Sequence, residues 1–256
     1  MRNLIKMDLY RMGRSRTFWI CLIITAVLAL TGAPISKLLY NLAASLSSEV
    51  REAFPAEVDL SVILRDPFPL AGFMLLLLSL CSFFHADMEN GFIKNIAGQM
   101  PQKGYTVLSK FLAAIVHNLI FVMTAIAGKV IGTLVVQRIV VNSGAADGIR
   151  VLLLKLLLIQ GISAVLLLAV TTLRSKSLGM ILAVLFGLGL TPLIYLGVNE
   201  ALSTVFGKDV DISRYMADAV LRENPLETGR AILTAVVTGG LFLLLAIRIF
   251  DRKDVN

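Results

Sequence analysis

The chain has 256 residues, of which 57% are hydrophobic and only 16% are charged, and its mean hydropathy is +0.83. Soluble domains are about half apolar and about a quarter charged. This composition excludes a disordered chain, disfavours a soluble enzyme and makes a membrane protein the first expectation. The net charge of +7 would suggest a nucleic-acid partner in a soluble protein, but in a membrane protein it is interpreted by position.

Residues 1–16 are basic and predict an interfacial helix with Met1, Ile5, Leu9 and Met12 on its apolar side. A plain positive flank of the first span is the alternative. Six later stretches are long and apolar enough to cross a bilayer, which takes about 20 helical residues. They cover about 17–39, which Pro34 can kink or end, then 69–86, 110–136, 151–173, 177–198 and 230–250. We therefore expect an all-α, polytopic membrane protein with a single domain.

The basic residues predict the orientation of these spans. With six spans, both termini lie on one side, whose segments carry 13 basic and five acidic residues, whereas the opposite segments carry 10 basic and 12 acidic. The basic residues on the terminal side lie in short segments beside the spans, where the positive-inside rule applies. We therefore place both termini in the cytoplasm and residues 40–68 and 199–229 outside the cell. This distribution requires no nucleic acid.

The sequence lacks the motifs of common catalytic sites. It contains no phosphate-binding loop, no zinc-protease motif and no dinucleotide signature. Its two histidines and two cysteines do not have the spacing of a metal site. We therefore expect neither an enzyme nor a chain with its own cofactor, and any uphill transport would draw energy from a partner or an ion gradient.

Few polar residues lie within the expected spans. His117 is the deepest titratable residue, Asn118 is beside it, and a hydrogen-bonded histidine inside the bundle is the simpler alternative to a proton relay. Lys129 and Lys155 lie near span ends, from which a lysine can extend to the membrane surface. No Asp or Glu lies deep in a span, which disfavours an ion-coupled carrier.

Small residues spaced four apart predict close helix contacts within the membrane. Gly128 and Gly132 have this spacing in the third span, and Ala183 and Gly187 have it in the fifth. Small side chains at such positions allow two helix backbones to approach each other.

Residues 87–109 form the most informative connection. Asp87 or Asn90 can cap a short helix, apolar residues at 92, 93, 96 and 97 would form its apolar side, Gly98 can end it, and Pro101 would prevent its continuation. Such a helix on the cytoplasmic side needs a cover for its apolar side. The membrane surface and a partner protein are both suitable.

The order of features in this region resembles the exporter-type, or type-2, ABC transporter permeases. An acid follows the second span, and then come Gly91-Phe92-Ile93-Lys94-Asn95, Pro101 and Ser109-Lys110 at the start of the third span. The similarity covers nearly the whole chain. It includes the basic N-terminal segment, six spans, a large outer segment before the last span, and the closing Phe250-x-Arg252-Lys253-Asp254-Val255.

The resemblance implies a permease subunit in the bacterial plasma membrane. It implies a second permease chain, the same or similar, and two separate ATPase subunits that bind ATP and Mg²⁺. The segment 87–109 would be the coupling segment, starting at Asp87, with Glu89 and Lys94 in docking and Gly91 and Pro101 in helix shape. Small permeases of this kind export lantibiotics, other peptides or drugs, including in immunity and antibiotic-resistance systems. We expect a hydrophobic or amphipathic cargo. The alternatives are an ion-coupled secondary transporter and a non-transporting immunity or sensory subunit.

Overall fold

The computed structural model describes residues 1–46, 54–69, 71–89, 104–173, 175–206, 211–223 and 226–252. These residues are mostly helical. The elements, in chain order, are α1 (Arg2–Arg14), α2 (Arg16–Leu46), β1 (Glu57–Asp59), α3 (Leu60–Arg65), α4 (Gly72–Glu89), α6 (Gly104–Val136), β2 (Arg138–Val140), α7 (Ala145–Leu173), α8 (Lys176–Leu188), α9 (Thr191–Phe206), η1 (Ser213–Tyr215), α10 (Ala217–Leu221) and α11 (Thr228–Arg252).

Four of the described helices, α2, α6, α7 and α11, are individually long and apolar enough to cross a membrane. The helices α8 and α9 pass the same test only as a pair, which is bent by 95° and raises the number to five if it is one span. The helix α4 is apolar but shorter. The prediction of a helical protein with several apolar spans is confirmed in this form, whereas six spans and a permease fold remain predictions.

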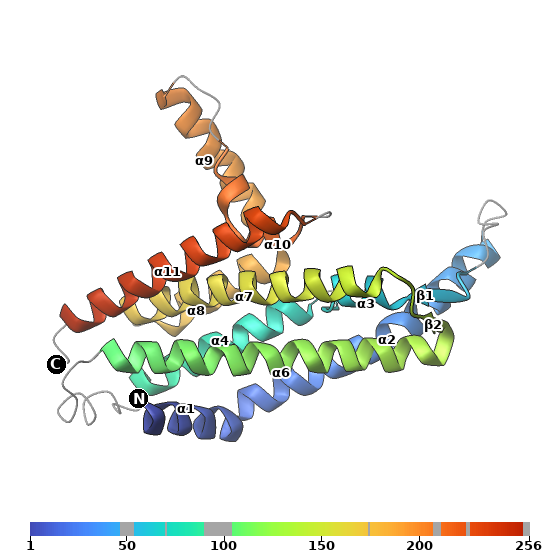
Figure 1. Ribbon diagram of the computed structural model, residues 1–256, viewed down its shortest axis with the longest axis horizontal. Helices are drawn as coiled ribbons and strands as arrows, with labels where there is room; N and C mark the ends of the chain where they lie inside the picture. Colours follow the sequence, from blue (N-terminus) through green and yellow to red (C-terminus); the bar gives the residue numbers. More distant parts are fainter. Residues whose placement is uncertain are drawn as a thin grey trace.

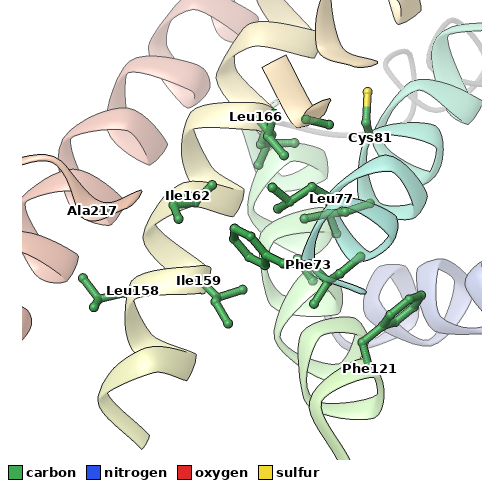
Figure 2. Packing of buried hydrophobic residues seen from close by; sticks show 14 of the residues in the cluster. Phe73, Leu77, Cys81, Phe121, Leu158, Ile159, Ile162, Leu166 and Ala217 are labelled. Carbon is green, nitrogen blue, oxygen red and sulfur yellow. The ribbon is translucent and has the colours of Figure 1, made fainter. Parts of the chain in front are cut away.

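The long helices run side by side and form one bundle (Figure 1). The main contacts join α11 to α7, α2 to α6 and α4 to α8. Figure 2 shows the apolar core between them, where Leu77 of α4 lies near Ile162 and Leu166 of α7. Apolar side chains also cover the outside of the bundle, for example Met123 and Leu241, each at least half exposed. A helix that is apolar on all sides suits a lipid environment.

The bundle has two different ends (Figure 1). The helix α1, the end of α4, the start of α6 and the end of α11 lie at one end, which we call the terminal end. The strands β1 and β2 and the helix α3 lie at the other, which we call the distal end. The strands form a parallel pair in which Val58 is opposite Ile139, an addition to the expected all-α fold. The side of the membrane on which each end lies remains a prediction.

Two predicted spans differ from the observed helices. The helix α2 continues through Pro34 to Leu46 instead of ending near residue 39. The expected span 177–198 breaks at Gly189, whose φ of 72° is the left-handed conformation that ends α8. Pro192 then lies in the first turn of α9, where a missing N–H costs nothing. Figure 1 shows α9 leaving the bundle as a separate arm.

The structure shows which side of α1 packs on the protein, whereas its predicted position at a membrane surface stays a prediction. The helix buries Leu4, Asp8 and Met12, whereas Met1, expected on the apolar side, is 47% exposed. Because α1 packs on α6 and Asp8 has a hydrogen-bond partner there, a polar contact helps to set the rotation of the helix. The plain apolar periodicity could not reveal that contact.

Small residues lie at the closest helix contacts. A Cβ added to Gly132 would come within 2.2 Å of the Leu30 carbonyl oxygen of α2, and one added to Gly128 within 2.8 Å of Ala29 Cβ. In α8, Ala183 is fully buried, and a Cβ on Gly187 would lie 2.4 Å from Met74 Cα of α4. Both predicted pairs therefore lie where two helix backbones approach each other.

Candidate functional site

The predicted coupling segment lies mainly outside the described residues. Asp87 and Glu89 belong to the last turn of α4. Gly91, Lys94 and Pro101 lie outside the described residues, so their expected roles remain predictions. The structure does describe the helices on both sides of this segment.

The start of α6 contacts α1 through a buried polar pair. Ser109 of α6 donates a hydrogen bond from its hydroxyl to Asp8 Oδ2 of α1 over 2.5 Å. Both side chains are almost fully buried, at 0% and 1% exposure. A buried carboxylate is costly unless it is hydrogen-bonded, so this pair holds α1 firmly in position on α6.

The same part of α6 contacts α4 and α11. Lys110 is 3% exposed, donates to the Phe84 carbonyl oxygen of α4 over 3.0 Å and lies 5.3 Å from the centre of the Phe83 ring. The backbone N–H of Gly104, at the first turn of α6, donates to Asp251 Oδ1 of α11 over 2.6 Å. A carboxylate at a helix N-terminus is favourable because the unpaired N–H groups there carry partial positive charge.

We call these five residues, Asp8, Gly104, Ser109, Lys110 and Asp251, the α6 junction. The junction joins α1, α4 and α11 to the start of α6. In the chain, Gly104 directly follows residues 90–103, and α4 ends directly before them. A force applied there would therefore reach three other helices through paired polar groups.

A second polar group lies deeper, between α4, α6 and α7. His117 Nε2 is 3.1 Å from Ser79 Oγ, and its ring stacks on Phe121 with ring centres 4.7 Å apart. Asn118 donates from Nδ2 to Gln160 Oε1 and to Ser163 Oγ, both over 2.9 Å. We call Ser79, His117, Asn118, Gln160 and Ser163 the polar cluster. Only His117 and Asn118 were predicted from the sequence, although Ser79, Gln160 and Ser163 are also polar residues inside mainly apolar runs.

Lys129 extends to the distal end, as a lysine near the end of a span is expected to do. Its Nζ contacts the backbone carbonyl oxygen of Asp66 and lies 3.5 Å from Asp66 Oδ2. The pair fastens α6 to the chain that follows α3. Lys129 therefore pairs with an acid at the distal end and does not belong to the polar cluster.

The residues described by the structure contain no group of three or more His, Cys, Asp or Glu side chains that could hold a metal ion. The chain matches no model of a known protein family, and a search of curated proteins finds no significant relative.

Proposed function

We propose that this chain is the permease subunit of an ATP-driven ABC exporter in the bacterial plasma membrane. The observation that carries the proposal is the α6 junction. It connects four helices beside the segment expected to dock on a separate ATPase. The apolar bundle, and the hydrogen-bonded carboxylates that join α1 and α11 to the start of α6, support a protein that receives movement at the terminal end.

In this mechanism, two ATPase subunits bind ATP and Mg²⁺ and close together beneath a pair of permease chains. Their movement displaces residues 87–109. The hydrogen bonds of Ser109 to Asp8 and of Gly104 to Asp251 make α1, α6 and α11 move as one unit. The change shifts the bundle between inward-open and outward-open states, because the ATPase contacts the two states differently. The apolar bundle suits a hydrophobic or amphipathic cargo such as a peptide, lantibiotic or drug.

The test is purification of the complete chain together with the ATPase encoded beside its gene. We expect the wild-type chain to retain this ATPase and Glu89→Lys to lose it. The matched control is Glu200→Lys, the same charge reversal on the arm α9, which should retain the ATPase. If no ATPase co-purifies, the proposed function is wrong. If Glu89→Lys binds the ATPase as the wild type does, the docking assignment is wrong.

An ion-coupled secondary transporter is the second candidate, and the polar cluster favours it. His117 Nδ1 and Asn118 Oδ1 are buried and have no hydrogen-bond partner among the described residues. Such atoms deep in a bundle can take part in proton or cation transfer. Transport that survives ATP depletion, stops with an ionophore and is lost in His117→Ala would establish this candidate and overturn the first.

A further inference from the structure

The distal end of the bundle contains a cavity of about 410 Å³ that the proposed function does not use. It lies between α3, α4, α7 and the chain after α10. One part of its wall is apolar and includes Phe68, Phe73 and Leu226. Another part carries the cations Arg65, Lys155 and Arg222. Ligand sites commonly have about this volume and combine apolar walls with a few polar groups.

Lys155 is the central cation of this cavity. It lies on α7, one turn after Val151 and one turn before Ile159, both of which are buried in the apolar wall. Its side chain is half-buried, and among the described residues it makes no hydrogen bond and no ion pair. An unpaired ammonium group in a partly apolar cavity is costly, and an anionic ligand would remove that cost.

The two carboxylates that line the cavity form their ion pairs with other cations, and Asp66 acts on Lys155 only at longer range. Asp66 pairs with Lys129, and Glu223 lies 2.8 Å from Arg230 Nη2. Arg65 is the one lining cation with a carboxylate partner in the described chain, since its Nη2 lies 2.6 Å from Asp147 Oδ2. The cavity therefore keeps an excess of positive charge.

Arg222 is fixed beside the cavity by the end of α8. Its Nη2 donates to the Phe186 carbonyl oxygen over 2.6 Å, and no carboxylate of the described residues pairs with it. The guanidinium lies against Gly189, where an added Cβ would come within 2.6 Å of Arg222 Cζ. The left-handed glycine that ends α8 thus makes room for this arginine. The fold holds a second cation in place without neutralising it.

From this arrangement we infer a binding site for an amphipathic anion, meaning a carboxylate or phosphate head group attached to an apolar chain. The head group contacts Lys155 with Arg222 nearby, and the chain lies along Phe68, Phe73 and Leu226. A charge-assisted hydrogen bond from Lys155 supplies selectivity for anions, and burial of the chain supplies affinity. The site is at the opposite end from the α6 junction and does not depend on an ATPase partner.

The test is equilibrium binding to the purified, delipidated chain in a neutral detergent, measured by native mass spectrometry. The free-amphiphile probes are laurate and dodecyl phosphate, with dodecyltrimethylammonium as the cationic comparison. The lipid probes are phosphatidylglycerol and phosphatidylcholine. We expect the anionic member of each set to bind more tightly. Preference for the single-chain anions identifies a free amphiphile as the ligand, and preference for phosphatidylglycerol identifies a membrane lipid.

Variants connect this binding to the cavity. Lys155→Met should weaken the binding of the preferred anion about tenfold or more, since it removes a hydrogen bond to a charged group. Lys155→Arg should retain most of the affinity. Lys37→Met is the matched control, because it removes the charge of an exposed lysine of α2 outside this cavity and should leave binding unchanged.

A variant that fills the cavity gives independent evidence. Val151→Phe keeps every cation but occupies the space of the apolar chain, so it should also weaken binding. Each variant is first checked for a single symmetrical peak in size-exclusion chromatography. Equal binding of cationic and anionic amphiphiles by the wild type would overturn the inference. So would equal losses in Lys155→Met and Lys37→Met, or wild-type affinity in both Lys155→Met and Val151→Phe.

Discussion

The two ends of the bundle use their charged residues differently. At the terminal end, Asp8 and Asp251 each accept a hydrogen bond from the start of α6. At the distal end, Lys155 and Arg222 border a cavity and have no carboxylate partner among the described residues. Hydrogen-bonded carboxylates fix the relative positions of helices, whereas cations without an ion-pair partner beside apolar walls suit a ligand. In our two proposals, the terminal end transmits movement and the distal cavity binds a ligand.

The contrast between the two ends assumes that the distal half of the bundle is closely packed apart from its cavity. Gly132→Ala tests this, because the added Cβ would lie 2.2 Å from the Leu30 carbonyl oxygen. We expect a loss of about 3 kcal/mol in the free energy of unfolding in mixed micelles, the upper part of the usual range for overpacking.

The control is Gly240→Ala, where an added Cβ meets no atom within 4 Å. It should be neutral or stabilise the protein by up to about 1 kcal/mol, because alanine favours a helix. Equal stability of the two variants would show that α2 and α6 are not in close contact.

The terminal end is tested by Asp8→Ala. This change leaves the buried Ser109 hydroxyl without its acceptor and removes a hydrogen bond to a charged group, so we expect a loss of about 2 kcal/mol in unfolding free energy. Glu200→Ala, at an exposed position of α9, should change stability by less than about 0.5 kcal/mol.

The double variant Asp8→Ala with Ser109→Ala measures how much of this loss comes from the interaction between the two side chains. If the two side chains act as a pair, the double variant should lose clearly less stability than the sum of the single losses. Strict additivity would contradict the assignment of this pair to the α6 junction.

The smallest effect is expected at the distal end, outside the long apolar helices. Asp59 caps α3 by accepting a hydrogen bond from the Ser61 backbone N–H over 2.8 Å, and Asn142 donates to its other oxygen. The Ser61 N–H, followed by the Asn142 amide, holds the pKa of Asp59 below its ordinary value. A carboxylate with a lowered pKa stabilises the folded state above its ordinary pKa of about 3.9, and this contribution disappears as the pH falls through the folded-state pKa.

The corresponding measurement compares the melting temperatures of the wild type and Asp59→Asn between about pH 6 and about pH 2. Asparagine keeps a capping oxygen but has no charge to lose. The wild type should be the more stable protein at the higher pH, and the difference should disappear at the lower pH. A difference independent of pH would show that the charge of Asp59 does not matter.

The sequence predicted the helical, apolar character of the fold because a bilayer demands long apolar runs. It could not predict the break between α8 and α9, since the stretch 177–198 is apolar throughout and only Gly189 and Pro192 mark the turn. The parallel pair β1 and β2 was also missed, because its strands have only three residues each and lie far apart in the chain.

The polar sites were less predictable because their partners are far apart in the chain. Asp8 and Ser109 are 101 residues apart, so a single acid in a basic segment gave no indication of its partner. Lys155 was interpreted as a lysine extending to the membrane surface, and only the structure shows the cavity that it borders. His117 was correctly expected to be hydrogen-bonded inside the bundle, since its neighbours in the sequence are apolar.

Site-directed crosslinking to the ATPase that co-purifies with the chain tests the central claim, that the terminal end receives the movement of an ATPase. The native Cys21 and Cys81 are both buried, so a cysteine introduced on the surface supplies the reactive thiol. Glu89→Cys lies at the terminal end, and Val141→Cys, at a 68% exposed position after β2, lies at the distal end. The account predicts a crosslink to the ATPase from Glu89→Cys and none from Val141→Cys. A crosslink from Val141→Cys alone would contradict it.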